Sequence, residues 1–261
     1  LTGSVLAYKY NAPILLVGNS DEEQEKVIAY LKTSLKQDGT VFILGGTSVV
    51  DNTIETKVKA SGFNNIVRLG GSNRYETSVK IAQEVMPRKG TPLILVYGQN
   101  YPDALSISST AAIMQSPILL VDKNEISEIV KQKIKEIEPI KVYLIGQEGV
   151  VGANIEKQVA ELTSLEKTNI IRISGKNRFE TSLAVAEYFS LSGKYACLAT
   201  GNNFPDALAG SVYAANSNSP MILVNQNLSE DTINYLKTRN MKGAAILGGE
   251  AVINREIEEQ L

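Results

Sequence analysis

Short apolar runs alternate with amphipathic stretches along this chain of 261 residues. In the middle of the chain the apolar runs cover residues 66–69, 93–97, 117–121 and 142–145, and the amphipathic stretches cover residues 74–85, 104–114, 125–137 and 151–162. We expect the apolar runs to be strands buried on both faces and the amphipathic stretches to be helices. Strands that alternate with helices pair in parallel, so the pattern predicts an α/β fold with mostly parallel sheets.

The pattern also repeats, and two motifs mark the repetition. Residues 68–78 (RLGGSNRYETS) return as residues 172–182 (RISGKNRFETS), and residues 98–105 (GQNYPDAL) return as residues 201–208 (GNNFPDAL). The two intervals are 104 and 103 residues. Motifs that recur in the same order at nearly one interval indicate tandem units, and tandem units offer several similar binding surfaces.

Two further stretches occur three times, and the first of them is strand-like in each copy. Residues 12–17 (APILLV) match residues 116–121 and 219–224, and residues 41–46 (VFILGG) match residues 142–147 and 244–249. These landmarks predict three repeats, at residues 1–65, 66–168 and 169–261. In this alignment Leu1 corresponds to Leu105 and Leu208, so we expect the first repeat to lack an opening segment of roughly 35–40 residues.

The composition argues against several classes of function. With a formal net charge of −2, the chain lacks the basic balance typical of nucleic-acid-binding proteins. No apolar run approaches the ~18–20 residues needed to cross a bilayer. The chain contains no histidine, which excludes Ser-His-Asp and Cys-His catalytic sites and His-ligated metals. We therefore predict no enzymatic activity, no cofactor and no metal, and we expect the single cysteine, Cys197, to be a core residue.

The first motif places charged and amide side chains where a strand ends and a helix begins. Asn73 and Asn177 are predicted N-caps, and Glu76 and Glu180 are predicted to complete capping boxes. The neighbouring arginines fall at the edge where open α/β sheets bind ligands, and a guanidinium pairs well with phosphate or carboxylate. The candidate ligand contacts from this motif are Arg68, Arg74, Arg172, Arg178, Asn73 and Asn177. The alternative is a purely structural role in capping and ion pairing.

The second motif also follows a strand and opens a helix. Proline suits the first helical turn, and Asp103 and Asp206 complement the helix dipole, which is a structural role. Just before them an asparagine precedes an aromatic ring, a common combination for holding a sugar. The candidate ligand contacts from this motif are Asn100, Tyr101, Asn203 and Phe204. With the arginines, they predict a shallow groove for an anionic glycan.

The repeated motifs resemble those of the cell wall binding repeat 2 family, found in surface proteins of clostridia and other Gram-positive bacteria. Four linked patterns carry the resemblance over essentially the whole chain: Arg-x-x-Gly-x-x-Arg-(Tyr/Phe)-Glu-Thr, Gly-x-Asn-(Tyr/Phe)-Pro-Asp-Ala-Leu, Pro-Ile-Leu-Leu-Val and Ile-Leu-Gly-Gly. The resemblance implies three tandem α/β repeats in a pseudo-threefold arrangement. It also implies an extracellular location at the cell wall and noncovalent anchoring to an anionic secondary polymer.

We expect the chain to be a non-catalytic module that anchors a surface protein to an anionic cell wall polysaccharide, without nucleic acid and without membrane insertion. Repetition of a weak site would hold a bound polymer at high effective concentration near the next site. Two alternatives stay open. A structural surface-layer component would self-associate without wall material, and a flavodoxin-like, small-ligand-binding enzyme domain would show a deep pocket in one repeat.

Overall fold

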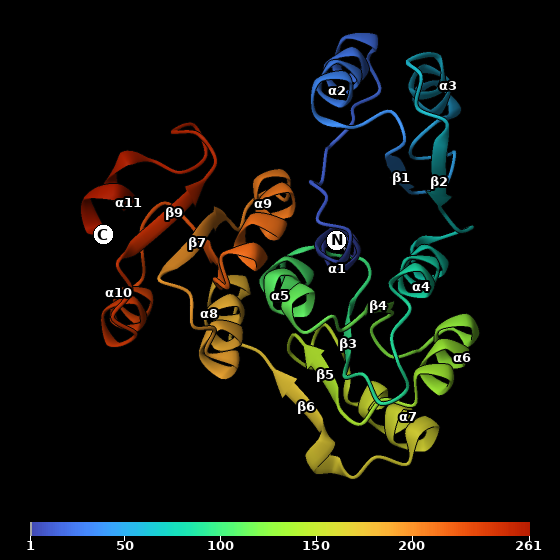
Figure 1. Ribbon diagram of the computed structural model, residues 1–261. Helices are drawn as coiled ribbons and strands as arrows, with labels where there is room; N and C mark the ends of the chain where they lie inside the picture. The colour runs from blue at the N-terminus through green and yellow to red at the C-terminus, as the bar shows by residue number, and fades with distance from the viewer. Residues whose placement is uncertain (1) are drawn as a thin grey trace.

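Three parallel sheets flanked by helices make up the computed structural model, which describes residues 2–261 (Figure 1). The predicted α/β fold with parallel pairing is confirmed. The first part of the chain contains α1 (Gly3–Lys9), α2 (Asp21–Ser34), β1 (Thr40–Leu44), α3 (Asn52–Ala60) and β2 (Asn65–Leu69). The predicted alignment of Leu1 with Leu105 and Leu208 lies outside the described residues.

The second and third parts of the chain repeat this order with more strands. The second contains α4 (Arg74–Val85), β3 (Leu93–Tyr97), α5 (Pro102–Ile113), β4 (Ile118–Val121), α6 (Glu128–Ile137), β5 (Val142–Ile145), α7 (Ala153–Thr163), a 3₁₀ turn (Lys167–Asn169) and β6 (Ile170–Ile173). The third contains α8 (Arg178–Phe189), β7 (Tyr195–Thr200), α9 (Pro205–Asn216), β8 (Met221–Val224), α10 (Glu230–Thr238), β9 (Gly243–Leu247) and α11 (Arg255–Gln260).

The strand order decides where the loops of the two motifs meet the sheets. The second sheet has the order β4-β3-β5-β6, and the third has the order β8-β7-β9. In open α/β sheets, ligands bind at the carboxyl ends of the two strands between which the strand order reverses. That crevice lies between β3 and β5 in the second sheet and between β7 and β9 in the third.

β2 and β6 each extend the sheet that precedes them in the chain. β2 pairs in parallel with β1 along its whole length, and β6 pairs in the same way with β5. Each of these strands then leads into the first helix of the next part of the chain, α4 or α8. The sheets therefore bridge successive repeats, and the repeat boundaries after residues 65 and 168 stay a prediction.

Three equivalent helices meet at the centre of the molecule. α1, α5 and α9 contact one another and lie in the middle of Figure 1, with the three sheets around them. α4 packs against α1, and α8 packs against α5 in the same way. Every residue of α5 from Ala104 to Ala112 is buried, which only a helix of small and apolar residues tolerates. The predicted pseudo-threefold packing of the repeats is confirmed.

The structure differs from the sequence expectation at residues 12–17. This stretch resembles β4 and β8 in sequence but forms no strand, and its residues Leu15 and Leu16 are 38% and 42% exposed. β4 and β8 pair with β3 and β7, whereas the first sheet contains only β1 and β2 among the described residues. Without a paired neighbour, the backbone has no ladder of hydrogen bonds to hold it as a strand.

The single cysteine is buried in the third sheet. Cys197 lies in β7 with 1% of its surface exposed, and burial raises the pKa of its thiol to about 11, so it is a core residue as predicted. None of the helices in residues 2–261 is long and apolar enough to cross a bilayer. Over the same residues, Asp, Glu and Cys side chains nowhere gather in a group of three that could hold a metal ion.

Candidate functional site

Asn73 and Asn177 cap the helices of the first motif. Oδ1 of Asn73 accepts a hydrogen bond from the backbone N–H of Glu76 at 2.9 Å. Oδ1 of Asn177 accepts from the N–H groups of Phe179 and Glu180 at 2.9 and 3.0 Å. The predicted N-caps are confirmed, and each satisfies donors that the first helical turn would otherwise leave unpaired.

The predicted capping boxes are wrong in one detail. Each glutamate side chain binds the backbone N–H of the residue before the N-cap, and not that of the N-cap itself. Glu76 accepts from the N–H of Ser72 at 2.8 Å, and Glu180 accepts from the N–H of Lys176 at 2.9 Å. The hydroxyl and N–H of Ser72, helped by Lys80, lower the pKa of Glu76 to about 2. The Glu76 carboxylate therefore stays ionised at neutral pH. Both carboxylates fix the glycine turn that leads from the strand into the helix.

The guanidinium groups of Arg68 and Arg172 are engaged within the fold. Nη1 of Arg172 donates to the carbonyl oxygens of Gly146 and Val151 at 2.8 and 2.6 Å, and Nε donates to Glu156 at 2.9 Å. The equivalent acceptors for Arg68 are Gly45, Val50 and Glu55. Only 18% of the Arg68 side chain and 17% of the Arg172 side chain is exposed. These contacts give both arginines a structural role, because they hold β2 and β6 against the preceding strand, loop and helix. We therefore leave Arg68 and Arg172 out of the ligand-binding surface that we propose.

Arg74 and Arg178 instead reach the loop that carries the second motif. Nη1 of Arg74 donates to the carbonyl oxygen of Gly98 at 2.6 Å, and Nη1 of Arg178 donates to that of Gly201 at 2.6 Å. A Cβ atom at Gly201 would lie 2.6 Å from Cε1 of Phe179, so this close approach requires glycine. Arg74 is exposed and Arg178 is half-buried, and their role as ligand contacts stays a prediction.

The loops of the second and third repeats touch through their aromatic residues. The ring centroids of Tyr101 and Phe204 are 5.7 Å apart, and the Tyr101 hydroxyl donates to the carbonyl oxygen of Asn202 at 2.8 Å. The guanidinium carbon of Arg178 lies 5.8 Å from the Tyr101 ring centroid, within the range of a cation–π contact. We refer to Tyr101, Arg178, Asn202, Asn203 and Phe204 as the loop cluster.

The two loop asparagines occupy equivalent, exposed positions. Oδ1 of Asn100 accepts from the N–H of Tyr101, and Oδ1 of Asn203 accepts from the N–H of Phe204, both at 2.9 Å. Their side-chain amide nitrogens have no hydrogen-bond partner among residues 2–261. Of the candidates from the sequence, the structure thus joins Tyr101, Arg178, Asn203 and Phe204 in one cluster. Arg74 and Asn100 lie by the loop of the second repeat, and Asn73 and Asn177 lie at the helix caps.

Asp103 adds a carboxylate for which the sequence predicts only a helix-opening role. A Cβ atom at Gly146, which follows β5, would lie 2.6 Å from Oδ2 of Asp103, so the carboxylate lies in the crevice between β3 and β5. Burial raises the pKa of Asp103 to about 6, and the charge of Arg178 opposes that rise. Asp206 lies beside Gly248 in the third repeat in the same way. The repeated Pro-Asp pair at a strand-to-helix junction is the sequence signal for these carboxylates.

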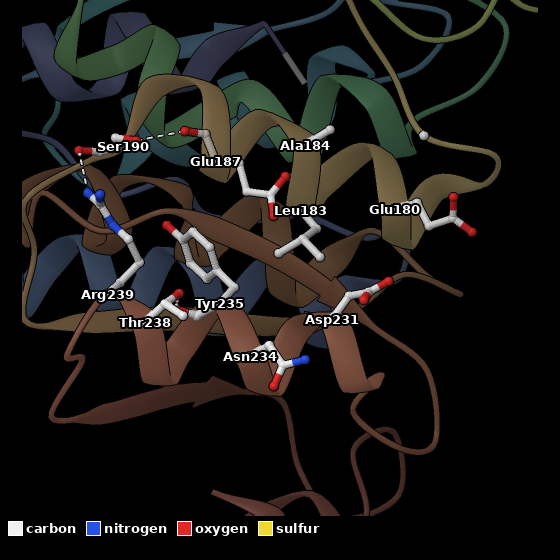
Figure 2. A pocket seen from close by; sticks show the side chains of 11 residues that line it. Glu180, Leu183, Ala184, Glu187, Ser190, Asp231, Asn234, Tyr235, Thr238 and Arg239 are labelled. Carbon is white, nitrogen blue, oxygen red and sulfur yellow. Dashed lines mark hydrogen bonds between the residues drawn. The ribbon is translucent and has the colours of Figure 1, made fainter.

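A separate open groove of about 600 Å³ lies between α8 and α10 (Figure 2). The carboxylates of Glu180, Glu187 and Asp231 line it together with Arg239. Arg239 donates from Nη2 to the carbonyl oxygen of Ser190 at 3.0 Å. Three carboxylates against one guanidinium disfavour an anionic ligand, so this groove does not compete with the loop cluster for one.

Three α/β repeats that are joined through their sheets define a tandem-repeat protein. The chain belongs to the family described as Cell wall binding domain 2 (CWB2), whose sequence profile matches residues 1–55, 68–156 and 172–258. The three matched segments confirm the resemblance stated from the motifs.

Two proteins of Bacillus subtilis match the chain in sequence, and a solved structure matches it in fold. The N-acetylmuramoyl-L-alanine amidase LytC of Bacillus subtilis (strain 168) is 29% identical over 264 residues, covering 100% of this chain and 50% of the relative. The amidase enhancer of the same organism is 25% identical over 204 residues, covering 78% and 27%. Cwp8 from Clostridium difficile has a TM-score of 0.84 at 25% identity, covering 99% of this chain and 44% of that chain. The chain therefore spans half or less of the length of these proteins.

Proposed function

We propose that the chain is a non-catalytic module that anchors a surface protein noncovalently to an anionic polymer of the cell wall. Membership of the CWB2 family supports the cell wall as the target. The observation that carries the choice of an anionic ligand is the position of Arg178 over the Tyr101 ring at a junction of two repeats. The exposed Phe204 lies on the Tyr101 ring as well. The location that goes with this function is the outer surface of the cell.

The loop cluster offers the contacts that an acidic carbohydrate requires. A guanidinium has five N–H donors, and Arg178 uses Nη1 on a backbone carbonyl, so further donors serve for bidentate pairing with phosphate or carboxylate. Sugar rings stack on aromatic faces such as those of Tyr101 and Phe204. The exposed amide nitrogens of Asn100 and Asn203 donate to hydroxyl groups.

Repetition strengthens the proposed binding. Arg74 holds the loop of the second repeat as Arg178 holds that of the third, so one polymer strand meets two similar surfaces. A strand bound at one surface stays at high effective concentration near the other, and two weak contacts add avidity. Since the net charge of the chain is −2, attraction for a polyanion has to come from such local clusters.

The relatives support a modular arrangement. One relative is an amidase and another an amidase enhancer, and in each the matched region is only part of the protein. In this proposal the chain supplies attachment to the wall, and any catalysis belongs to a separate domain.

Sedimentation with purified Gram-positive cell walls tests the proposal. Intact walls should retain the chain, and walls whose secondary polymers have been removed with acid should not. The double variant Arg178→Ala, Phe204→Ala should lose most of its retention. Arg239→Ala, which removes an exposed arginine of the same repeat outside the loop cluster, should keep it. Equal retention on stripped and intact walls would exclude the secondary polymer and indicate peptidoglycan instead.

A further inference from the structure

The glycine that begins the second motif is held from two sides in the same way in both repeats. On one side, the arginine that opens α4 or α8 donates to the carbonyl oxygen of Gly98 or Gly201 at 2.6 Å. On the other side, the N–H of Gly98 donates to the carbonyl oxygen of Val121 at 2.8 Å, and that of Gly201 donates to Val224 at 2.9 Å. The residue that follows β4 or β8 therefore lies beside the same loop as the guanidinium group.

This residue differs in charge between the two repeats. It is Asp122 after β4 and Asn225 after β8, and both are exposed. The side chain of Asn225 contacts the loop cluster directly, because its Oδ1 accepts from Nδ2 of Asn202 at 2.9 Å. The carbonyl oxygen of Asn202 in turn accepts from the Tyr101 hydroxyl. Two hydrogen bonds thus link Asn225 to the ring over which Arg178 lies.

In the second repeat the same position brings a carboxylate to the loop. Gln99 stands where the third repeat has Asn202, and its Nε2 donates to the Tyr75 hydroxyl at 3.0 Å. Burial raises the pKa of Tyr75 and the charge of Asp122 raises it further, while the Gln99 amide and the charge of Arg74 oppose the rise. The carboxylate and the guanidinium therefore act on the same group, whereas the third repeat offers a neutral amide beside its guanidinium.

The lysine next to Asp122 does not cancel this charge within the fold. The backbone N–H of Lys123 donates to Oδ1 of Asp122 at 2.7 Å. Over residues 2–261, no ion pair joins the ammonium group of Lys123 to the Asp122 carboxylate. The negative charge thus stays beside the loop of the second repeat.

We propose that this position determines how strongly each loop binds an anionic group, and that Asn225 makes the loop of the third repeat the stronger site. The inference rests on the wall-binding function proposed above. A carboxylate beside a guanidinium competes with the ligand for its N–H donors and repels the charge of a phosphate or carboxylate group. An amide keeps the hydrogen bond to Asn202 without that charge. One polymer strand then meets two loops of unequal affinity for its anionic groups.

Isosteric exchange at the two positions tests the proposal on the full chain. Asn225→Asp adds a carboxylate and keeps an acceptor for Asn202, and Asp122→Asn removes the charge from the second repeat. At 0.1 M salt, retention on intact Gram-positive walls should become about threefold weaker in Asn225→Asp and about threefold stronger in Asp122→Asn. Both differences should vanish near 1 M salt.

Matched controls make the same changes away from the loops. Asp231→Asn and Asn234→Asp alter exposed positions of α10 and should leave retention unchanged. Asn225→Ala removes the acceptor without adding a charge, and it should keep most of its retention. A loss in Asn225→Ala as large as in Asn225→Asp would overturn the proposal, because the hydrogen bond and not the charge would then set the affinity.

Calorimetric titration with soluble sodium polyphosphate separates this proposal from the wall-binding function. The affinity for polyphosphate should be highest in Asp122→Asn, intermediate in the unchanged chain and lowest in Asn225→Asp. Equal affinity of the unchanged chain and Asn225→Asp would overturn the role of Asn225, even if intact walls retain the chain. Equal retention on intact and acid-stripped walls would instead contradict the wall-binding function, whatever the order with polyphosphate.

Discussion

The guanidinium carbon of Arg178 lies 5.8 Å from the ring centroid of Tyr101, although the two residues open helices of different repeats. Arg178 also donates to the carbonyl oxygen of Gly201, and Tyr101 donates to that of Asn202. The loop cluster therefore exists only when the second and third repeats pack correctly. A cation–π contact at an exposed site contributes roughly 0.5–1 kcal/mol, so this contact positions Arg178 more than it stabilises the fold.

Arg178 and Arg172 should respond differently to replacement by alanine. Arg178→Ala should lower the free energy of unfolding by about 1 kcal/mol and remove most wall retention. Arg172→Ala should lower it by about 2–3 kcal/mol, because a carboxylate and two carbonyl groups lose their donor. Urea denaturation and wall sedimentation on the same samples separate the two effects. An Arg178→Ala chain as unstable as Arg172→Ala would contradict the roles assigned here.

The hydroxyl of Tyr101 is tested by Tyr101→Phe. This change removes the hydrogen bond to the carbonyl oxygen of Asn202 and keeps the ring. We expect the free energy of unfolding to fall by about 0.5–1.5 kcal/mol and wall retention to stay the same, since the stacking face is unchanged. Tyr195→Phe, at a tyrosine of β7 that is 47% exposed, is the matched control and should change neither quantity. A loss of retention in Tyr101→Phe would assign the hydroxyl to the ligand.

Most of the secondary structure follows from sequence periodicity. β3, β5 and α4 have the predicted bounds, because long apolar runs and a capped amphipathic stretch leave few alternatives. Residues 12–17 show where sequence periodicity does not predict the structure. Their sequence is nearly that of β4, but a strand forms only when a neighbouring strand pairs with it. The residues of a strand do not determine which other strand will lie beside it. The pairing of β6 with β5 was unpredictable for the same reason.

The candidate site was predicted less completely than the fold. Arg172 and Arg178 belong to one motif, yet the first finds its acceptors inside the preceding repeat and the second lies beside a neighbouring loop. Motif spacing does not distinguish these two environments, because both depend on contacts between repeats. Asp103 was assigned to the helix alone, and its place in a sheet crevice depends on strand order.

The glycine of the third-repeat loop should not tolerate a side chain. In Gly201→Ala the new Cβ would lie 2.6 Å from Cε1 and 3.1 Å from Cδ1 of Phe179, so the ring or the loop has to move. We expect the free energy of unfolding to fall by about 1–3 kcal/mol. Gly249→Ala is the matched control, since its Cβ would meet nothing within 4 Å, and it should change stability by less than about 0.5 kcal/mol. Equal thermal denaturation midpoints for the two variants would contradict the close approach.

Wall retention should weaken as salt is added. The Debye length shortens from about 10 Å at 0.1 M salt to about 3 Å at 1 M salt. Added salt should therefore weaken the proposed contact, because it pairs an accessible guanidinium with an anionic polymer. Residual retention by the Arg178→Ala chain should depend less on salt than retention by the unchanged chain. Sedimentation across a sodium chloride series measures both slopes. Identical slopes would show that Arg178 makes no charged contact with the wall.

Asp103 should make stability depend on pH. Burial raises its pKa from 3.8 to about 6 in the folded chain, so the folded form holds the proton more tightly than the unfolded form. The free energy of unfolding should therefore fall as pH rises from about 4 to about 6, and the unfavourable contribution should be complete above that range. A pKa shift of this size corresponds to at most about 3 kcal/mol, and partial solvent access reduces the expected change in the free energy of unfolding to about 1–2 kcal/mol.

Asp103→Asn tests this pH dependence by urea denaturation. The variant should be more stable than the unchanged chain at pH 7.5 by about 1–2 kcal/mol and equal to it near pH 3.5. The charge of Arg178 opposes the rise in the pKa of Asp103, so Arg178→Ala should raise this pKa further. The free energy of unfolding should then fall over a wider pH range than in the unchanged chain. A narrower pH range would exclude the coupling between the two side chains.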